Sequence, residues 1–254
     1  MIYIIIFIAA IIAAITGIGG GIIIRPILST TDMSAIVVNF YACIAIISST
    51  LYSIIKAYYR KESVNLKVIG FLSIGSFVGG VLGNIIFQEV LKLFSDNTFI
   101  VIQSILLIVT LSFVLYASIK PIKVHKDFSS RLIMILVGIG VGMLSVFVGI
   151  GGGVINVIIL DILFKMDKKS IVINSLVMIF ISQTASALLM IKTDIFSSIE
   201  STTLLYIILT SFLGGIIGKE ISLKITSNVI KKMFIIVITV VLFLNLFIII
   251  EKIL

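Results

Sequence analysis

Eight long apolar runs limit what this chain can fold into. They cover residues 1–28, 34–59, 66–88, 97–119, 131–163, 169–191, 201–218 and 228–250. Most have about the 20 residues that a helix needs to cross the hydrocarbon core of a bilayer. Of the 254 residues, 60% are hydrophobic and 12% are charged, whereas soluble domains have about 45–50% and about 25%. The sequence therefore predicts an all-α polytopic membrane protein and excludes a soluble or disordered chain.

Three motifs occur twice and in the same order, which indicates an internal duplication. The copies are GIGGG at 17–21 and 149–153, IVVN at 36–39 with IVIN at 171–174, and SFVGGVLG at 76–83 with SFLGGIIG at 211–218. The offsets between copies are 132, 135 and 135 residues. We therefore divide the chain into a first transmembrane repeat over 1–119, a basic linker over 120–130 and a second transmembrane repeat over 131–254.

The positions of Lys and Arg distinguish two membrane topologies. If all eight runs cross, 10 of these residues lie inside and 8 outside, with Arg25 set aside as intramembrane. If the fifth run enters and returns on one side, the division becomes 15 to 3, which the positive-inside rule favours. Because the first run carries the same motif, each half is predicted to be a glycine-tipped re-entrant or broken hairpin followed by three transmembrane helices. An odd number of crossings makes the repeats inverted, as in many secondary transporters, whereas the alternative is eight simple crossing helices with glycine kinks.

The two glycine clusters are the first candidates for substrate binding. Consecutive glycines weaken a helix by about 1 kcal/mol each relative to alanine, and bare backbone is tolerated at membrane depth only against protein or a water-filled cavity. Helices that start just after the clusters would direct their N–H groups and positive dipole ends toward an anion. Close helix packing is the alternative. The candidates are Gly19, Gly20, Gly21, Gly151, Gly152 and Gly153.

Polar side chains inside the apolar runs are the second group of candidates. Arg25 is the one basic residue deep inside a run, and its planar guanidinium suits an oxyanion; the alternative is that it extends to the outer interface. Uncharged amides and hydroxyls can replace the water shell of an anion, although they also form ordinary interhelical hydrogen bonds. These candidates are Asn39, Ser49, Asn174, Gln183 and Thr184.

Several functional classes lack their residues. Cys43 and His125 are the only residues of their types, and no cluster has the spacing of metal ligands. No acid–base pair or nucleophile arrangement is visible, so we expect neither an enzyme nor a cofactor. The net charge is +8, but the basic residues lie in short loops between apolar runs, a pattern typical of membrane proteins rather than of nucleic-acid binding.

The stretches GIGGGIIIRPIL at 17–28 and GIGGGVINVIIL at 149–160 resemble the signature of the TauE/SafE sulfite exporter family. The resemblance covers nearly the whole chain and implies a multi-spanning carrier of sulfur-containing anions such as sulfite, sulfonates or thiosulfate. By motif it selects Gly17, Gly19, Gly20, Gly21, Pro26, Gly149, Gly151, Gly152 and Gly153. The chain departs from the family pattern at Ile158, where a second proline often stands.

Together these observations predict a secondary or potential-driven permease in the plasma membrane, with its basic loops in the cytoplasm. We expect it to export small anions and to bind them near the midplane between the two GIGGG tips. The expected partners are the anion and the lipid bilayer, with a homodimer left open. An anion channel and a non-transporting subunit that anchors a partner protein are the alternatives.

Overall fold

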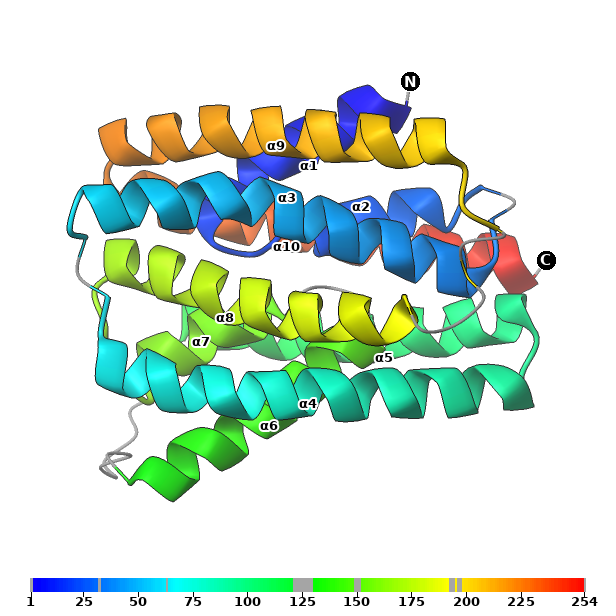
Figure 1. Cartoon of the computed structure of the whole chain (residues 1–254), viewed down its shortest axis with the longest axis horizontal. Helices are drawn as coiled ribbons and strands as arrows, with labels where there is room; N and C mark the ends of the chain where they lie inside the picture. The colour runs from blue at the N-terminus through cyan, green and yellow to red at the C-terminus, as the bar shows by residue number, and fades with distance from the viewer. Residues whose placement is uncertain are drawn as a thin grey trace.

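The computed structural model describes residues 2–31, 33–62, 64–120, 130–148, 152–191, 195 and 198–253. Within these ranges the chain forms α-helices and no strand, which confirms the predicted all-α class (Figure 1). The helices are α1 (Ile2–Thr16), α2 (Gly21–Leu28), α3 (Ala35–Tyr59), α4 (Leu66–Leu93), α5 (Asp96–Ile119), α6 (Arg131–Phe147), α7 (Gly153–Ile162), α8 (Lys168–Met190), α9 (Ser201–Lys224) and α10 (Ser227–Ile253).

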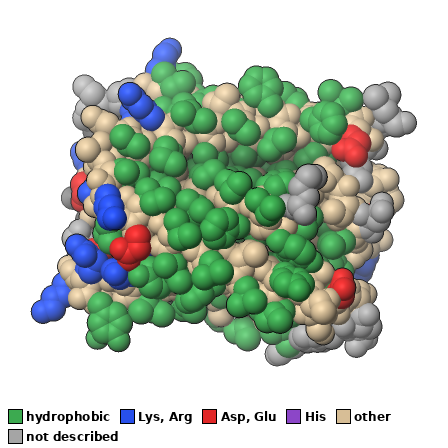
Figure 2. Space-filling view, turned by 90° about the horizontal axis from the view of Figure 1, so that it is seen from above, with side chains coloured by type: hydrophobic (Ala, Val, Ile, Leu, Met, Phe, Trp, Pro, Cys, Tyr) green, Lys and Arg blue, Asp and Glu red, His purple; other side chains and the backbone are tan. Residues whose placement is uncertain are grey.

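Six helices are long and apolar enough to cross a membrane, namely α3, α4, α5, α8, α9 and α10. At 1.5 Å per residue, even α8, with 23 residues, exceeds the roughly 30 Å hydrocarbon core. Large apolar side chains such as Phe113 and Phe243 lie exposed, and apolar side chains are spread across the middle of the face seen in Figure 2. The chain is therefore a multi-pass membrane protein.

Side-chain caps set where three of the long helices begin. Asn65 accepts a hydrogen bond from the Val68 amide at the start of α4, and Ser95 accepts one from the Thr98 amide at the start of α5. Asp167 does the same for Ser170 at the start of α8. Each cap supplies an acceptor for an amide that has no partner within its own helix.

The first and fifth apolar runs are each broken at their glycine cluster. α1 and α2 have 15 and 8 residues, and α6 and α7 have 17 and 10. Even the longest of the four would span only about 26 Å. In Figure 1 each pair turns back within the molecule, α1–α2 from the end that holds both termini and α6–α7 from the opposite end. The predicted broken hairpins are therefore present.

Stripes of glycine show the relative directions of the helices. Gly75 and Gly79 on α4 lie against Gly138 and Met143 on α6, so these two helices run parallel. Gly214 and Gly218 on α9 lie against Ala10 and Ala14, so α9 and α1 are also parallel. Small residues allow backbones this close.

Helices of the two halves interleave. α4 packs against α6 and α8, and α9 packs against α1 and α3. The two sets of contacts are equivalent, because α4, α6 and α8 in one set correspond to α9, α1 and α3 in the other. This is the pattern expected of two copies of one unit. The division at 119 and 131 and the inverted topology in a bilayer stay predictions, and the basic linker, 121–129, lies outside the described residues.

Candidate anion site between the hairpin tips

The two hairpin tips meet in the interior of the protein. Gly17 and Gly19 have φ angles of 74° and 77°, and Gly152 has a φ of 68°, a left-handed conformation that residues with a Cβ disfavour. Gly153 lies directly against the backbone carbonyl of Ile18. The glycines therefore make the sharp turns and also the close approach of one tip to the other.

Ser175 on α8 connects the two tips. Its hydroxyl lies 2.8 Å from the carbonyl oxygen of Gly17 and 3.4 Å from that of Gly153, and the residue is fully buried. Sequence reasoning missed Ser175, although it directly follows the repeated IVIN motif. Its hydroxyl therefore hydrogen-bonds to both tips, and the Ile179 side chain, one turn further along α8, also lies against both, near Gly19 and Gly153.

Both short helices begin at the tips, as the anion hypothesis requires. Gly20 precedes α2, which starts at Gly21, and Gly152 precedes α7, which starts at Gly153. Neither Gly20 nor Gly152 offers a side chain to cap these helices. Their first amides and positive dipole ends therefore lie at the meeting point of the tips. Gly151, also predicted for this site, and Gly149, which the family motif selects, lie outside the described residues.

A chain of buried polar groups extends from the second tip. Gly152 contacts Ser145 on α6, whose hydroxyl accepts a hydrogen bond of 3.2 Å from the Gln183 amide. Cys43 on α3 donates to the carbonyl oxygen of Gln183 at 3.0 Å. The structure therefore brings the predicted residue Gln183 to the second tip through Ser145, which the sequence analysis did not select.

Two predicted asparagines carry buried polar atoms without a partner among the described residues. Neither amide atom of Asn39 is hydrogen-bonded, and the Oδ1 atom of Asn174 is also unpaired. A buried amide without a partner costs about 1–3 kcal/mol, so such groups call for a ligand or water. Asn39 lies one turn before Cys43 on α3 and shares its face toward α8. Asn174 borders a separate cavity with Val64 and Asn65.

The remaining predicted residues lie apart from the tips. The Ser49 hydroxyl bonds to the Ile46 carbonyl of its own helix, and the Ser49 backbone packs against Gly215. The Thr184 hydroxyl likewise bonds to the Phe180 carbonyl. Neither residue has a contact with the described tip residues, so their roles in binding stay predictions.

Arg25 is buried within the protein. It stands in the last turn of α2, and only 3% of the residue is exposed. Its Nε atom has no hydrogen-bond partner among the described residues. The Arg25 side chain is therefore covered by protein, and its role in anion binding stays a prediction.

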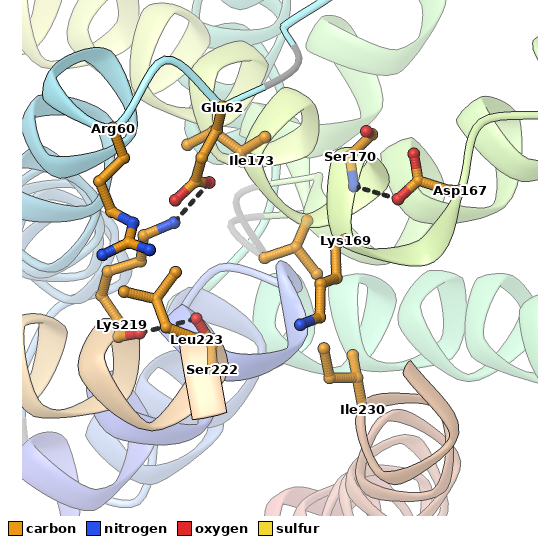
Figure 3. A pocket seen from close by; sticks show the side chains of 11 residues that line it. Arg60, Glu62, Asp167, Lys169, Ser170, Ile173, Lys219, Ser222, Leu223 and Ile230 are labelled. Carbon is orange, nitrogen blue, oxygen red and sulfur yellow. Dashed lines mark hydrogen bonds and ion pairs between the residues drawn. The ribbon is translucent and has the colours of Figure 1, made fainter. Parts of the chain in front are cut away.

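A cavity of about 280 Å³ approaches the first tip from the end of the protein where α8 begins (Figure 3). Its lining includes Val172, whose backbone contacts Gly17 on the other side. Hydrogen bonds from Ser170 hold the pKa of the Asp167 carboxyl at the mouth below its usual value. One residue of α8 therefore separates this cavity from the turn of the first hairpin.

Comparison with protein-family models gives one match. The model of the sulfite exporter TauE/SafE family matches residues 2–244, nearly the whole chain. No curated protein and no solved structure matches the chain. The matched region includes both hairpins, five of the six candidate spans and most of α10, so the chain belongs to the TauE/SafE sulfite exporter family of membrane transporters.

Proposed function

We propose that this protein is a secondary or potential-driven permease that exports small sulfur-containing anions such as sulfite, sulfonates or thiosulfate. The observation that carries the proposal is the meeting of two glycine tips in the buried interior, with two helix N-termini beside them. Anions are stabilised at helix N-termini by free amides and the helix dipole. Broken helices that meet near the midplane form the substrate sites of many secondary transporters.

The inverted topology is part of this proposal. α6 runs parallel to α4 and α1 runs parallel to α9, as the glycine contacts require. Because α4 and α9 start at opposite ends of the molecule (Figure 1), the two hairpins enter from opposite ends. Lys and Arg gather at the end where α4, α6 and α8 begin, seen at one end of Figure 2, and we assign this basic end to the cytoplasm.

The membrane potential supports export. A negative charge that leaves a negative interior gains about 2.3 kcal/mol per 100 mV. Import of the same anion would need a coupled cation or proton. Glu62 and Asp167, the two carboxylates that line the cavity beside the first tip, are already engaged by Lys219 and by the α8 cap.

The test is uptake of radiolabelled sulfite into proteoliposomes under an imposed membrane potential, with thiosulfate, sulfonates, sulfate and chloride as competitors. Saturable, potential-driven uptake inhibited by sulfur anions is the expected result. Flux that does not saturate, together with unitary currents, would instead identify an anion channel. The absence of flux for every sulfur anion, at either potential and under a pH gradient, would refute transport and favour a subunit that anchors a partner.

A further inference from the structure

The cavity at the basic end is lined by three cationic side chains. Arg60 comes from the end of α3, Lys169 from the start of α8 and Lys219 from α9, and Figure 3 shows them around one space. Two carboxylates, Glu62 and Asp167, share the lining, so the titratable side chains around the cavity carry one net positive charge. Asp167 is engaged as the cap of α8.

Glu62 holds Lys219 in place. The Lys219 ammonium lies 2.8 Å from Glu62 Oε2, and the Lys219 side chain is 3% exposed. A buried ammonium needs such a partner, because an unpaired charge in the interior is costly. The second carboxylate oxygen of Glu62 is buried and has no partner among the described residues. The pair therefore keeps a fixed cation beside the cavity rather than a lysine that moves freely in solvent.

The duplicated sequence shows that this cation occurs at one end only. Lys219 directly follows the second copy of the SFLGGIIG motif, and the residue that follows the first copy is Asn84. Asn84 is buried and neutral, and its amide donates to the Ser186 hydroxyl at 3.0 Å. The corresponding positions of the two repeats thus differ by one full charge, which the basic end carries.

We propose that Arg60, Lys169 and Lys219 form an anion-recruiting site at the cytoplasmic mouth, where small divalent oxyanions are selected over monovalent anions before they reach the hairpin tips. This inference rests on the proposed function, because it assigns a first binding step to the same transporter. Val172 connects this mouth to the first hairpin tip, since it lines the cavity and also contacts Gly17. A divalent anion interacts twice as strongly with the fixed charges as a monovalent anion does at the same distance.

Sulfite flux into proteoliposomes tests the site through its concentration dependence. The variants are Arg60→Gln, Lys169→Gln and the double variant Glu62→Gln/Lys219→Met, which removes the buried pair without leaving one charge alone. Arg60→Gln and Lys169→Gln each remove one net positive charge and should raise the sulfite concentration for half-maximal flux about three- to tenfold. The double variant keeps the net charge but removes the Lys219 ammonium as a direct partner of the anion, so it should raise the same concentration as well. All three should leave the maximal flux within about twofold. The increase should shrink at high salt, because exposed charges are screened. Lys224→Gln, an exposed change at the end of α9, is the control and should change neither quantity.

Two results would overturn the inference. One is an unchanged half-saturation concentration in all three variants, and the other is an equal increase in Lys224→Gln. A variant whose maximal flux falls while its half-saturation concentration stays at the wild-type value would also reject a recruiting role. Such a result would indicate that the residue has a structural role.

Thermal unfolding of the purified protein separates this site from transport itself. Sulfate should raise the unfolding midpoint of the wild type more than chloride of equal ionic strength does, since a ligand stabilises the state that binds it. The double variant should lose this difference. If the wild type transports no sulfur anion, the proposed function fails. A sulfate effect on the unfolding midpoint that is lost in the double variant would still support the recruiting site. The absence of any sulfate effect in the wild type would reject the recruiting site.

Discussion

Gly153→Ala is the sharpest test of the contact between the two hairpin tips. A Cβ at this position would meet the Ile18 carbonyl oxygen of the opposite hairpin and would lie 2.7 Å from Cδ1 of Ile179. Real Cβ atoms essentially never approach other heavy atoms more closely than 3.0 Å. The carbonyl belongs to the backbone and cannot rotate away as a side chain can, so the tips must separate by an amount on the order of 1 Å.

Such a displacement has two expected effects of different size. Overpacking of a close contact costs about 1–3 kcal/mol, which lowers the unfolding midpoint by roughly 2–4 °C per kcal/mol in a chain of this length. Transport should suffer more, because a misplacement of about 1 Å in a preorganised site can reduce its rate about a hundredfold. We therefore expect a folded protein with little sulfite flux.

Gly140→Ala provides the matched control. Gly140 lies in α6 of the same hairpin, and an added Cβ there would have no other atom within 4 Å. This variant should keep the flux and the unfolding midpoint of the wild type. Initial rates of sulfite uptake and thermal unfolding of both purified variants are the two measurements. Sulfite flux in Gly153→Ala within twofold of the wild type would refute the reasoning, because the site would then not depend on how closely the tips approach.

Variants of three further residues, Ser175, Arg25 and Asp167, test other parts of the structure. Ser175→Ala removes the hydroxyl between the tips and should lower stability by about 0.5–1.5 kcal/mol and sulfite flux severalfold; Ser211→Ala, whose buried hydroxyl has no partner among the described residues, should change neither in the same assays. Arg25→Ala should weaken sulfite binding about tenfold or more without unfolding the protein, and an unchanged affinity would place Arg25 outside the site. The lowered pKa of Asp167 means that its cap stabilises the fold above the pKa of the unfolded chain and loses this effect as the pH falls through the folded pKa. Asp167→Asn should therefore keep the cap and flatten the dependence of the unfolding midpoint on pH in the acid range, whereas Asp167→Ala should cost about 1 kcal/mol at neutral pH.

The broken hairpins could be predicted because glycine clusters are poor both as helix and as lipid-exposed backbone. Two clusters at matching positions within long apolar runs therefore indicated breaks, and α1–α2 and α6–α7 have them. The loop charges indicated that the fifth run does not simply cross, and the repeated motif extended this to the first run; the six candidate spans are the six runs without a cluster. These features depend on local sequence and on the bilayer, so they can be read without knowledge of packing.

Which side chains face the tips could not be read in the same way. A helix that is apolar all round carries no periodic signal of its buried face, and α8 is such a helix, so the sequence selected Asn174 and Thr184 as readily as Gln183. The structure shows that Val172, Ser175, Ile179 and Gln183 contact the tips or Ser145.

These four residues of α8 are spaced three, four and four apart, so they form one stripe along the helix. At about 100° per residue, Asn174 lies on the far side of α8 from this stripe, and it faces the separate cavity beside Val64. Thr184 points away from the stripe as well. Asn39 and Asn174 are therefore equivalent in sequence but not in environment. Asn174 is part of α8, which runs past both tips, whereas Asn39 lies on the neighbouring helix α3. A repeat identifies which segments correspond, but the packing of one copy against the other decides which residue of each segment reaches the hairpin tips.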